Sequence, residues 1–237
     1  MPECCGSTSR FAIYFCPSQD SVLFQLGSQW LGRDAVSGKV LDPGLPRGLA
    51  HPDWLRATQS PRRYGFHATL KPPFRLVEGA NSEDLRSAVR AFAAAHDAFE
   101  APSLHVGTLG SFLALVLTDA CQAFVEFAGA CVRQFDSFRA PATEDEIANR
   151  LHDKMPERER EHVRRWGYPY VFDTWKFHMS LTGSLPKESL PPLEKILTQR
   201  FSSACGQPVL VNSICIFHEP APGSPLHLFE RANLRPR

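Results

Sequence analysis

The chain has 237 residues, long enough for one large domain or two small lobes with a sizeable hydrophobic core. Hydrophobic residues make up 43% and charged residues 22%, which is typical of a folded globular protein and excludes wholesale disorder. The net charge of +1 argues against a protein that binds a nucleic-acid duplex by neutralising many phosphates.

No run of about 18 apolar residues is present, so no membrane-spanning segment is expected. The stretch MPECCGSTSR at the start is polar and lacks the apolar part of a secretory signal, so we expect a cytoplasmic protein. The seven cysteines are scattered and form no C-x-x-C pair, which indicates reduced thiols rather than a disulfide framework or a zinc site. We therefore expect no metal and no cofactor.

In chain order, RFAIYF at 10–15 predicts a first strand, and apolar residues at helical spacing predict a helix over 20–32. The proline-rich residues 42–62 are interpreted as a surface loop. Acidic residues after Ser82, followed by apolar residues three and four apart, predict a helix over 82–99 capped by that serine. Residues 103–118 predict two strands around a turn at Gly110 and Ser111.

A second helix is expected over 122–138. The run EREREHVRRW ends a segment, 141–166, whose alternating charges indicate a solvated helix rather than a nucleic-acid contact. A further helix is expected over about 187–203, followed by strands in PVLVNSICIF and PLHLFERA. Each half of the chain thus has a histidine-containing strand, then a helix, then a two-strand unit, which indicates an internal duplication.

The two histidine segments are YGFHATLKPPF, 64–74, and WKFHMSLTG, 175–183. Alternate side chains of a strand point to opposite faces, so each segment places a histidine, a hydroxyl and a lysine on one face, with apolar residues behind. Two copies of Phe-His-x-Ser/Thr-apolar arise by chance on the order of one time in a thousand, whereas one copy would indicate a packed core histidine. The residues on the shared face are His67, Thr69 and Lys71 in the first segment and Lys176, His178 and Ser180 in the second.

Two imidazoles with two hydroxyls suit an in-line phosphoryl displacement. A neutral imidazole accepts a proton from the attacking water, and a protonated one donates a proton to the leaving oxygen. Histidine can do both because its usual pKa, about 6.5, lies near neutrality. The hydroxyls and lysines would stabilise charge on the phosphate oxygens.

The phrases FHATL and FHMSL resemble the paired H-x-[ST] signatures of the 2H phosphoesterase superfamily, which includes LigT-like RNA 2′,5′-ligases and cyclic phosphodiesterases. The wider phrases RYGFHATLKPPFRL and WGYPYVFDTWKFHMSLTG, with RFAIYF, look like its bacterial branch associated with phosphonate metabolism. The resemblance implies an α+β fold in which two pseudo-symmetric lobes with antiparallel sheets flank a central cleft. It also implies metal-independent attack on cyclic phosphodiesters. His67 and His178 would be the catalytic pair, and Thr69 and Ser180 would bind phosphate.

We expect residues 1–237 to form one bilobal domain, with lobes centred on strands at 65–71 and 175–182 and a helical insert at 120–166 that could act as a lid or select the substrate. Tyr14, Lys71 and Lys176 are candidate substrate-binding residues, whereas the roles of Tyr64 and Arg75 stay open because the proline pair at 72–73 makes strand alternation uncertain.

Three functions remain open. The expected one is hydrolysis of a small 2′,3′- or 1,2-cyclic ribose or nucleotide phosphate, linked to phosphonate breakdown. The second is RNA-end processing or ligation, which predicts a basic track and salt-sensitive RNA binding. The third is a non-catalytic module that binds a nucleotide or another phosphorylated ligand. The sequence does not say which histidine is the base, nor the oligomeric state.

Overall fold

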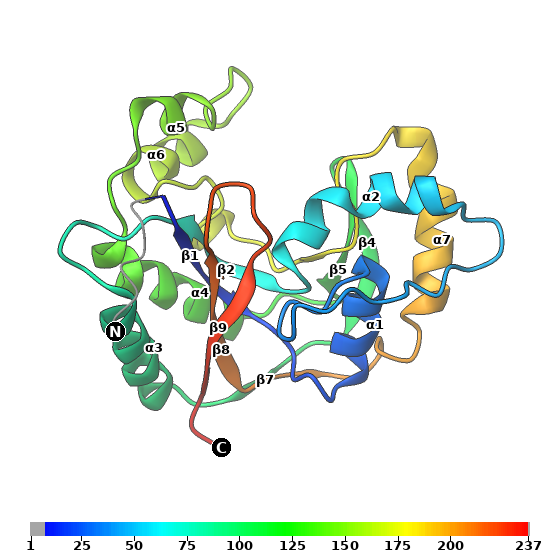
Figure 1. Cartoon of the computed structure of the whole chain (residues 1–237), viewed down its shortest axis with the longest axis horizontal. Helices are drawn as coiled ribbons and strands as arrows, with labels where there is room; N and C mark the ends of the chain where they lie inside the picture. The colour runs from blue at the N-terminus through cyan, green and yellow to red at the C-terminus, as the bar shows by residue number, and fades with distance from the viewer. Residues whose placement is uncertain (1–7, 237) are drawn as a thin grey trace.

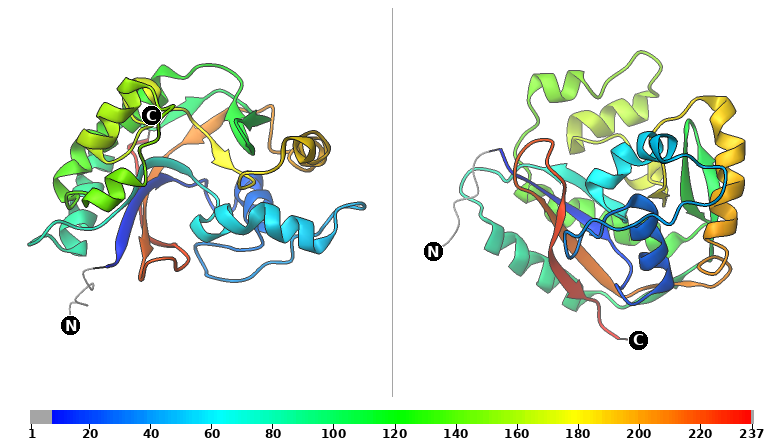
Figure 2. Two further views of the ribbon diagram at one scale, coloured as in Figure 1. Left: turned by 90° about the horizontal axis from the view of Figure 1, so that it is seen from above. Right: turned by 45° about the vertical axis from the view of Figure 1, so that its right-hand side comes forward.

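The computed structural model describes residues 8–236 and has two lobes that lie side by side (Figure 1). Seven strands form one antiparallel sheet in the order β4-β5-β6-β2-β1-β8-β9, and it bends into an arch when seen from above (Figure 2). The expected α+β class with antiparallel strands is confirmed. The strands of this sheet are β1 (Arg10–Phe15), β2 (Ala68–Phe74), β4 (Leu104–Leu109), β5 (Phe112–Leu117), β6 (Met179–Ser180), β8 (Ser213–Glu219) and β9 (His227–Asn233).

Helices flank both ends of the sheet: α3 to α6 lie beside β1, β2, β8 and β9, whereas α1, α2 and α7 lie with β4 and β5 (Figure 1). Short 3₁₀ helices occur at Asp136–Phe138 (η1), Phe172–Thr174 (η2) and Lys187–Ser189 (η3). The helices are α1 (Val22–Leu31), α2 (His51–Tyr64), α3 (Ser82–Ala95), α4 (Gln122–Phe135), α5 (Glu144–Ala148), α6 (Glu157–Trp166) and α7 (Leu190–Arg200). Across residues 8–236, none of the helices is both long enough and apolar enough to cross a membrane.

The duplicated order expected from the sequence is present. The first half runs β2, α3, β3 (Phe99–Ala101), β4, β5, and the second runs β6, α7, β7 (Val209–Val211), β8, β9. β3 and β7 pair with each other, and beyond them each chain half crosses to the other lobe. The first half's hairpin, β4–β5, pairs with β6, and the second half's hairpin, β8–β9, reaches β2 through β1. The two halves are therefore intertwined, and each lobe contains chain from both.

The prediction of a loop over 42–62 is wrong, because its second part belongs to α2. Trp54, Ala57, Thr58 and Pro61 are buried at helical spacing, and the prolines had masked this period. Pro52 lies in the first turn, where a proline is tolerated because the amide there has no partner within the helix.

The proline inside α2 connects this helix to the second histidine segment. Pro61 has no amide proton, so the carbonyl of Ala57, four residues earlier, cannot receive the usual helical hydrogen bond. The amide of Gly183 donates to that carbonyl instead, at 2.7 Å. Pro61, which would weaken an isolated helix, thus leaves the Ala57 carbonyl free to accept the hydrogen bond that holds the end of the WKFHMSLTG segment.

Most other elements agree with expectation, with local differences. The cap of α3 is Asn81, which accepts from the amides of Glu83 and Asp84, rather than Ser82. In the second histidine segment only Met179–Ser180 is strand, so the expected strand over 175–182 is much shorter. Of the cysteines, those at 16, 131 and 215 are buried and those at 121 and 205 are half-buried, all unpaired. Cys4 and Cys5 lie outside the described residues.

The first histidine segment is packed against α1 at a glycine. Phe66, which precedes His67, is buried, and its ring occupies the space where a Cβ on Gly27 would stand, 2.3 Å from Phe66 Cγ. A glycine inside a helix lowers helix stability. At Gly27 the absence of a side chain, which lowers helix stability, also makes room for the Phe66 ring to approach the helix closely.

Replacement of Gly27 by alanine tests this packing. We expect Gly27→Ala to lower the free energy of unfolding by about 1–3 kcal/mol, because overpacking outweighs the gain in helix propensity. Urea denaturation measures the difference. Gln25→Ala, on the exposed side of the same helix, is the control and should change stability by less than about 0.5 kcal/mol. A Gly27→Ala protein as stable as the wild type would contradict the packing argument.

Candidate active site

The pairing of β2 with β6 decides how the two motifs face each other. Ala68 pairs with Met179 in an antiparallel register. Counting one residue to each side sets His67 opposite Ser180 and Thr69 opposite His178, all on one face of the sheet. The two histidines are then diagonal neighbours, and such neighbours on one face lie about 7–8 Å apart. Each imidazole therefore has the hydroxyl residue of the other motif across from it.

His67 is held on three sides. Its Nδ1 donates to the carbonyl of Gly65 at 2.9 Å, since a carbonyl can only accept, and its Nε2 accepts from Thr69 Oγ1 at 3.1 Å. The ring of Tyr14 stacks on it, with centroids 3.6 Å apart. The pKa of His67 is lowered to about 4, chiefly by burial; the hydrogen bond to Gly65 opposes this shift and the charge of His178 adds to it. The imidazole of His67 is neutral at pH 7.

His178 repeats the arrangement. Its Nδ1 donates to the carbonyl of Lys176 at 2.9 Å, which again is the carbonyl two residues earlier, and its ring lies edge-on to Phe112. Burial lowers the pKa of His178 below its usual value, and the Lys176 hydrogen bond partly offsets this. Both motifs thus pin Nδ1 to the backbone and leave Nε2 as the basic nitrogen.

A cavity of about 280 Å³ opens on this face. Its lining brings together four of the predicted site residues: Tyr14, His67, Thr69 and Ser180. His178 is not itself part of the lining and stands beside it. None of the described residues that line the cavity is an aspartate or a glutamate, and Arg10 and Arg150 give the lining positive charge. The remaining lining residues are Ser60, Pro61, Tyr64, Pro72, Pro73, Tyr168 and Thr182.

The side chain of Arg10 is oriented by a buried carboxylate that lies outside the cavity lining. Glu219, with no exposed surface, forms ion pairs with both Arg10 and Arg63 and accepts from the amide of Gly223. Burial acts to raise the pKa of Glu219, but the hydrogen bonds from Arg10 and Arg63 lower it on balance. One carboxylate thus holds two guanidinium groups, and the cluster keeps a net positive charge.

The two lysines do not join the cavity. The expectation that Lys71 shares a face with His67 is wrong, because β2 carries bulges: Tyr14 pairs with Thr69, but Ile13 pairs with Lys71. One extra residue on β2 reverses the alternation of side chains. Lys71 is 2% exposed, and its Nζ contacts Asp136 Oδ1 at 2.9 Å, at the end of α4. Lys176 is exposed and precedes the short strand β6.

The segment 120–166 contributes to the site from one side. Arg150, between α5 and α6, lines the cavity together with Tyr168, which follows α6. Arg75, whose role the sequence left open, anchors this segment by an ion pair with Glu146 at 3.1 Å. Sequence reasoning assigned no role to Arg10, Arg150 or Tyr168. Arg10 and Tyr168 lie within the phrases RFAIYF and WGYPYVFDTWKFHMSLTG, which could have marked them, whereas nothing in the local pattern marks Arg150.

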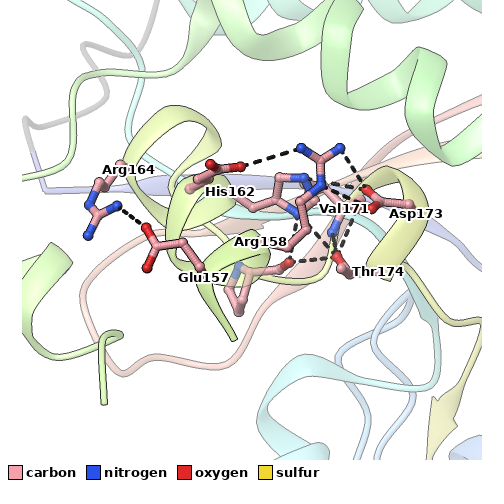
Figure 3. Close-up of polar contacts among 9 residues, drawn as sticks. Glu157, Arg158, His162, Arg164, Val171, Asp173 and Thr174 are labelled. Atoms are coloured by element: carbon pink, nitrogen blue, oxygen red, sulfur yellow. Dashed lines mark hydrogen bonds and ion pairs between the residues drawn. The ribbon is translucent and has the colours of Figure 1, made fainter. Parts of the chain in front are cut away.

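A second cluster of polar contacts fixes the segment that precedes the second motif (Figure 3). His162 of α6 is buried beside Thr174, with Nδ1 3.2 Å from Thr174 Oγ1, and its Nε2 lies 3.5 Å from Asp173 Oδ1. Arg158 reaches the same aspartate at 3.0 Å. These contacts fasten η2 to α6 directly before WKFHMSLTG, so His162 has a packing role. Within residues 8–236, His, Cys, Asp and Glu side chains form no group of three or more able to hold a metal ion.

Comparison with solved structures returns chains of similar overall arrangement. Escherichia coli LigT complexed with 3′-AMP matches over 96% of this chain and 99% of its own, with 11% identity and a TM-score of 0.45. A protein from Thermus thermophilus matches over the same shares, with 15% identity and a TM-score of 0.46.

Among curated proteins, two relatives share the name ribose 1,5-bisphosphate phosphokinase PhnN. The one from Janthinobacterium sp. (strain Marseille) is 39% identical over 233 residues, which are 95% of this chain and 51% of the relative. The one from Laribacter hongkongensis (strain HLHK9) is 35% identical, over 92% of this chain and 50% of the relative. The chain thus spans about half the length of these relatives, and their phosphonate-related name agrees with the expected branch.

A family model described as "Protein of unknown function (DUF1045)" matches residues 69–227, from the threonine of the first motif to the start of β9. The match covers well over half of the chain and includes all of the second motif. This chain therefore belongs to the DUF1045 family.

Proposed function

We propose that this protein is a phosphodiesterase that opens small cyclic ribose phosphates by general acid and base catalysis from His67 and His178. The observation that carries the proposal is the register of β2 and β6, which sets two H-x-[ST] motifs on one face of the sheet beside a cationic cavity. A phosphodiester anion suits a cavity lined by two arginines and by no carboxylate.

The hydrolysis needs one proton moved at each end of the reacting bond. One neutral imidazole accepts a proton from water as the water oxygen bonds to phosphorus. The other imidazole, protonated, donates a proton to the ring oxygen as its bond to phosphorus breaks, so a phosphomonoester and a free hydroxyl result. The paired Nδ1–H hydrogen bonds fix both rings with Nε2 available for these transfers.

The other motif residues would stabilise the charge that develops. Thr69 and Ser180 would donate hydroxyl hydrogen bonds to the non-bridging oxygens, which strengthen as negative charge grows. The Thr69 hydroxyl, which donates to His67 Nε2 in the free protein, would turn to the substrate when that ring is protonated. Tyr14, stacked on His67, would hold the plane of the ring.

The curated relatives support a ribose phosphate as the substrate. They are named for a kinase acting on ribose 1,5-bisphosphate, and this chain corresponds to about half of their length. The chain contains no G-x-x-x-x-G-K-[ST] phosphate-binding sequence, and we assign the nucleotide-dependent step of those relatives to their other half. Opening of a 1,2-cyclic ribose phosphate at the bond from phosphorus to the 2-oxygen would leave a phosphate ester at position 1, which is one of the two phosphate positions of ribose 1,5-bisphosphate.

The two alternatives make different predictions. An RNA-end processing enzyme or ligase needs a basic track beyond the cavity, and its RNA affinity would fall steeply with salt. A non-catalytic module would bind phosphorylated ligands without turnover. The small cavity and the near-zero net charge favour a small substrate over RNA, and the two complete motifs favour an enzyme over a binding module.

Alanine substitutions of the two histidines test the catalytic roles. We expect His67→Ala and His178→Ala each to lower kcat for a 1,2- or 2′,3′-cyclic ribose phosphate by about 10²–10⁴-fold, because each removes one proton transfer. The KM should change much less. His105→Ala, at an exposed position of β4, is the control. Wild-type turnover that survives either motif substitution would refute the assignment, and no wild-type turnover of any cyclic phosphate would refute the proposed activity.

The low pKa values predict an acidic optimum. The productive state has one imidazole neutral and one protonated, and both groups titrate below 6.5. As pH rises above the higher of the two pKa values the acid is lost, and as pH falls below the lower one the base is lost. The kcat/KM for a cyclic phosphate without a second phosphoryl group should therefore peak between about pH 4 and 6.5. A maximum above pH 7.5, or a flat profile from 4 to 9, would contradict this.

A further inference from the structure

The arginine side of the cavity continues into a second, smaller space. A hollow of about 30 Å³ adjoins the main cavity and shares Arg10, Pro73 and Arg150 with it. Its other lining residues include Arg75, Arg139 and Glu146. Four guanidinium groups and one carboxylate thus surround a space next to the motifs.

Arg150 differs from the other arginines there. Arg10 forms an ion pair with Glu219, Arg75 with Glu146, and Arg139 with Asp136. For the guanidinium of Arg150, the part of the chain at 8–236 supplies no hydrogen bond and no carboxylate within ion-pair distance. Burial lowers the pKa of Arg150, and the charges of Arg10 and Arg139 act in the same direction, while Glu146 and Tyr168 oppose them. A partly buried cation without a bound carboxylate is costly, and an anionic ligand would offset that cost.

The arginine end lies apart from the histidine end. Arg10 is four residues before Tyr14 on β1, which corresponds to about 13 Å along a strand, and the ring of Tyr14 stacks on His67. Tyr168 lines the same cavity, and because burial raises the pKa of Tyr168 to about 12, its hydroxyl stays protonated and can donate. A ligand that spans the cavity would therefore meet hydroxyl and imidazole groups at one end and guanidinium and phenol donors at the other.

We propose that Arg10, Arg150 and Tyr168 form a subsite for a second phosphoryl group, so that the substrate is a cyclic ribose phosphate that also carries a phosphomonoester on its far end. This inference rests on the proposed function and names its substrate class. Arg150 is the specificity residue, since its guanidinium has no protein partner to give up. A phosphomonoester at this position carries close to two negative charges at neutral pH and offers acceptors for a planar guanidinium fork.

The subsite also gives the segment 141–166 a role. Arg150 belongs to it, and the Arg75–Glu146 ion pair fastens it to the end of β2. The adjoining space is a poor track for RNA, because its volume is only about 30 Å³. A kinase that acts on ribose 1,5-bisphosphate needs a sugar with two phosphoryl groups, and a hydrolase that selects a doubly phosphorylated sugar would supply it.

The test compares ribose 1,2-cyclic phosphate with and without a 5-phosphate. In the wild type, kcat/KM should be at least about tenfold higher for the 5-phosphorylated compound, because hydrogen bonds to charged groups contribute that much or more. Arg150→Met keeps the aliphatic stem and removes the charge. It should lower kcat/KM for the 5-phosphorylated compound roughly 10- to 100-fold, mainly by raising KM. The kcat/KM for the compound without the 5-phosphate should change by less than about threefold. Arg150→Lys should recover part of the loss.

Arg164→Met, at an exposed position of α6 where the side chain pairs with Glu157, is the matched control and should leave both substrates unchanged. Equal use of the two compounds by the wild type, or an equal loss for both in Arg150→Met, would overturn the subsite while leaving the proposed hydrolase intact.

A binding measurement separates this inference from the proposed activity. By calorimetry, ribose 5-phosphate should bind the wild-type protein, ribose should not, and Arg150→Met should weaken the binding of ribose 5-phosphate at least about tenfold. The result does not depend on turnover, so the subsite can be judged even if no cyclic phosphate is hydrolysed. Ribose 5-phosphate that fails to bind, or that binds both proteins equally, would refute the subsite.

Discussion

The arrangement of the site depends on one short antiparallel contact, the pairing of Ala68 with Met179. It joins two strands that are far apart in the sequence and belong to different halves of the duplication. Side chains in a sheet alternate strictly, so a slip of one residue in this pairing would turn one motif away from the other. Because β6 has only two residues, the register cannot depend on β6 alone and must be held by contacts around it.

Three tryptophan side chains provide much of that support. Trp175 donates from Nε1 to the carbonyl of Thr69 at 2.9 Å, which ties the second motif segment directly to the first motif. Trp30 donates to the carbonyl of Leu181 at 2.8 Å, and Trp54 donates to the carbonyl of Trp30 at 2.7 Å. Together with the Gly183 amide on Ala57, the Trp30 bond satisfies backbone groups directly after β6, and the Trp175 bond ties the segment before β6 to β2. Indole hydrogen bonds thus substitute for the long strand that the sequence leads one to expect.

Charge is divided between the two sides of β2. On the side away from the cavity, Lys71 and Asp136 neutralise each other beneath α4, and Arg139 supports the same carboxylate. The carboxylate of Glu219, which pairs with Arg10, is outside the lining of the main cavity, so the permanently charged side chains that line it are the cations Arg10 and Arg150. The potential inside the cavity is therefore positive although the whole chain is nearly neutral. Burial also keeps both imidazoles neutral at pH 7, so both rings can accept protons. An anion that enters the main cavity meets no carboxylate in its lining.

The sequence by itself determined the longer strands, the helices with clear apolar periodicity, the duplicated order and the identity of the two motifs, because these follow from local patterns of two or nearly four residues. Only the tertiary structure decided that 51–64 is helical, since buried positions such as Trp54 and Ala57 have meaning only against a partner surface. It also decided the side of Lys71, because a bulge is set by how β1 and β2 fit together. Arg10 and Arg150 come from segments about 140 residues apart, and no spacing rule connects them; only the folding of both lobes around one cavity brings them together.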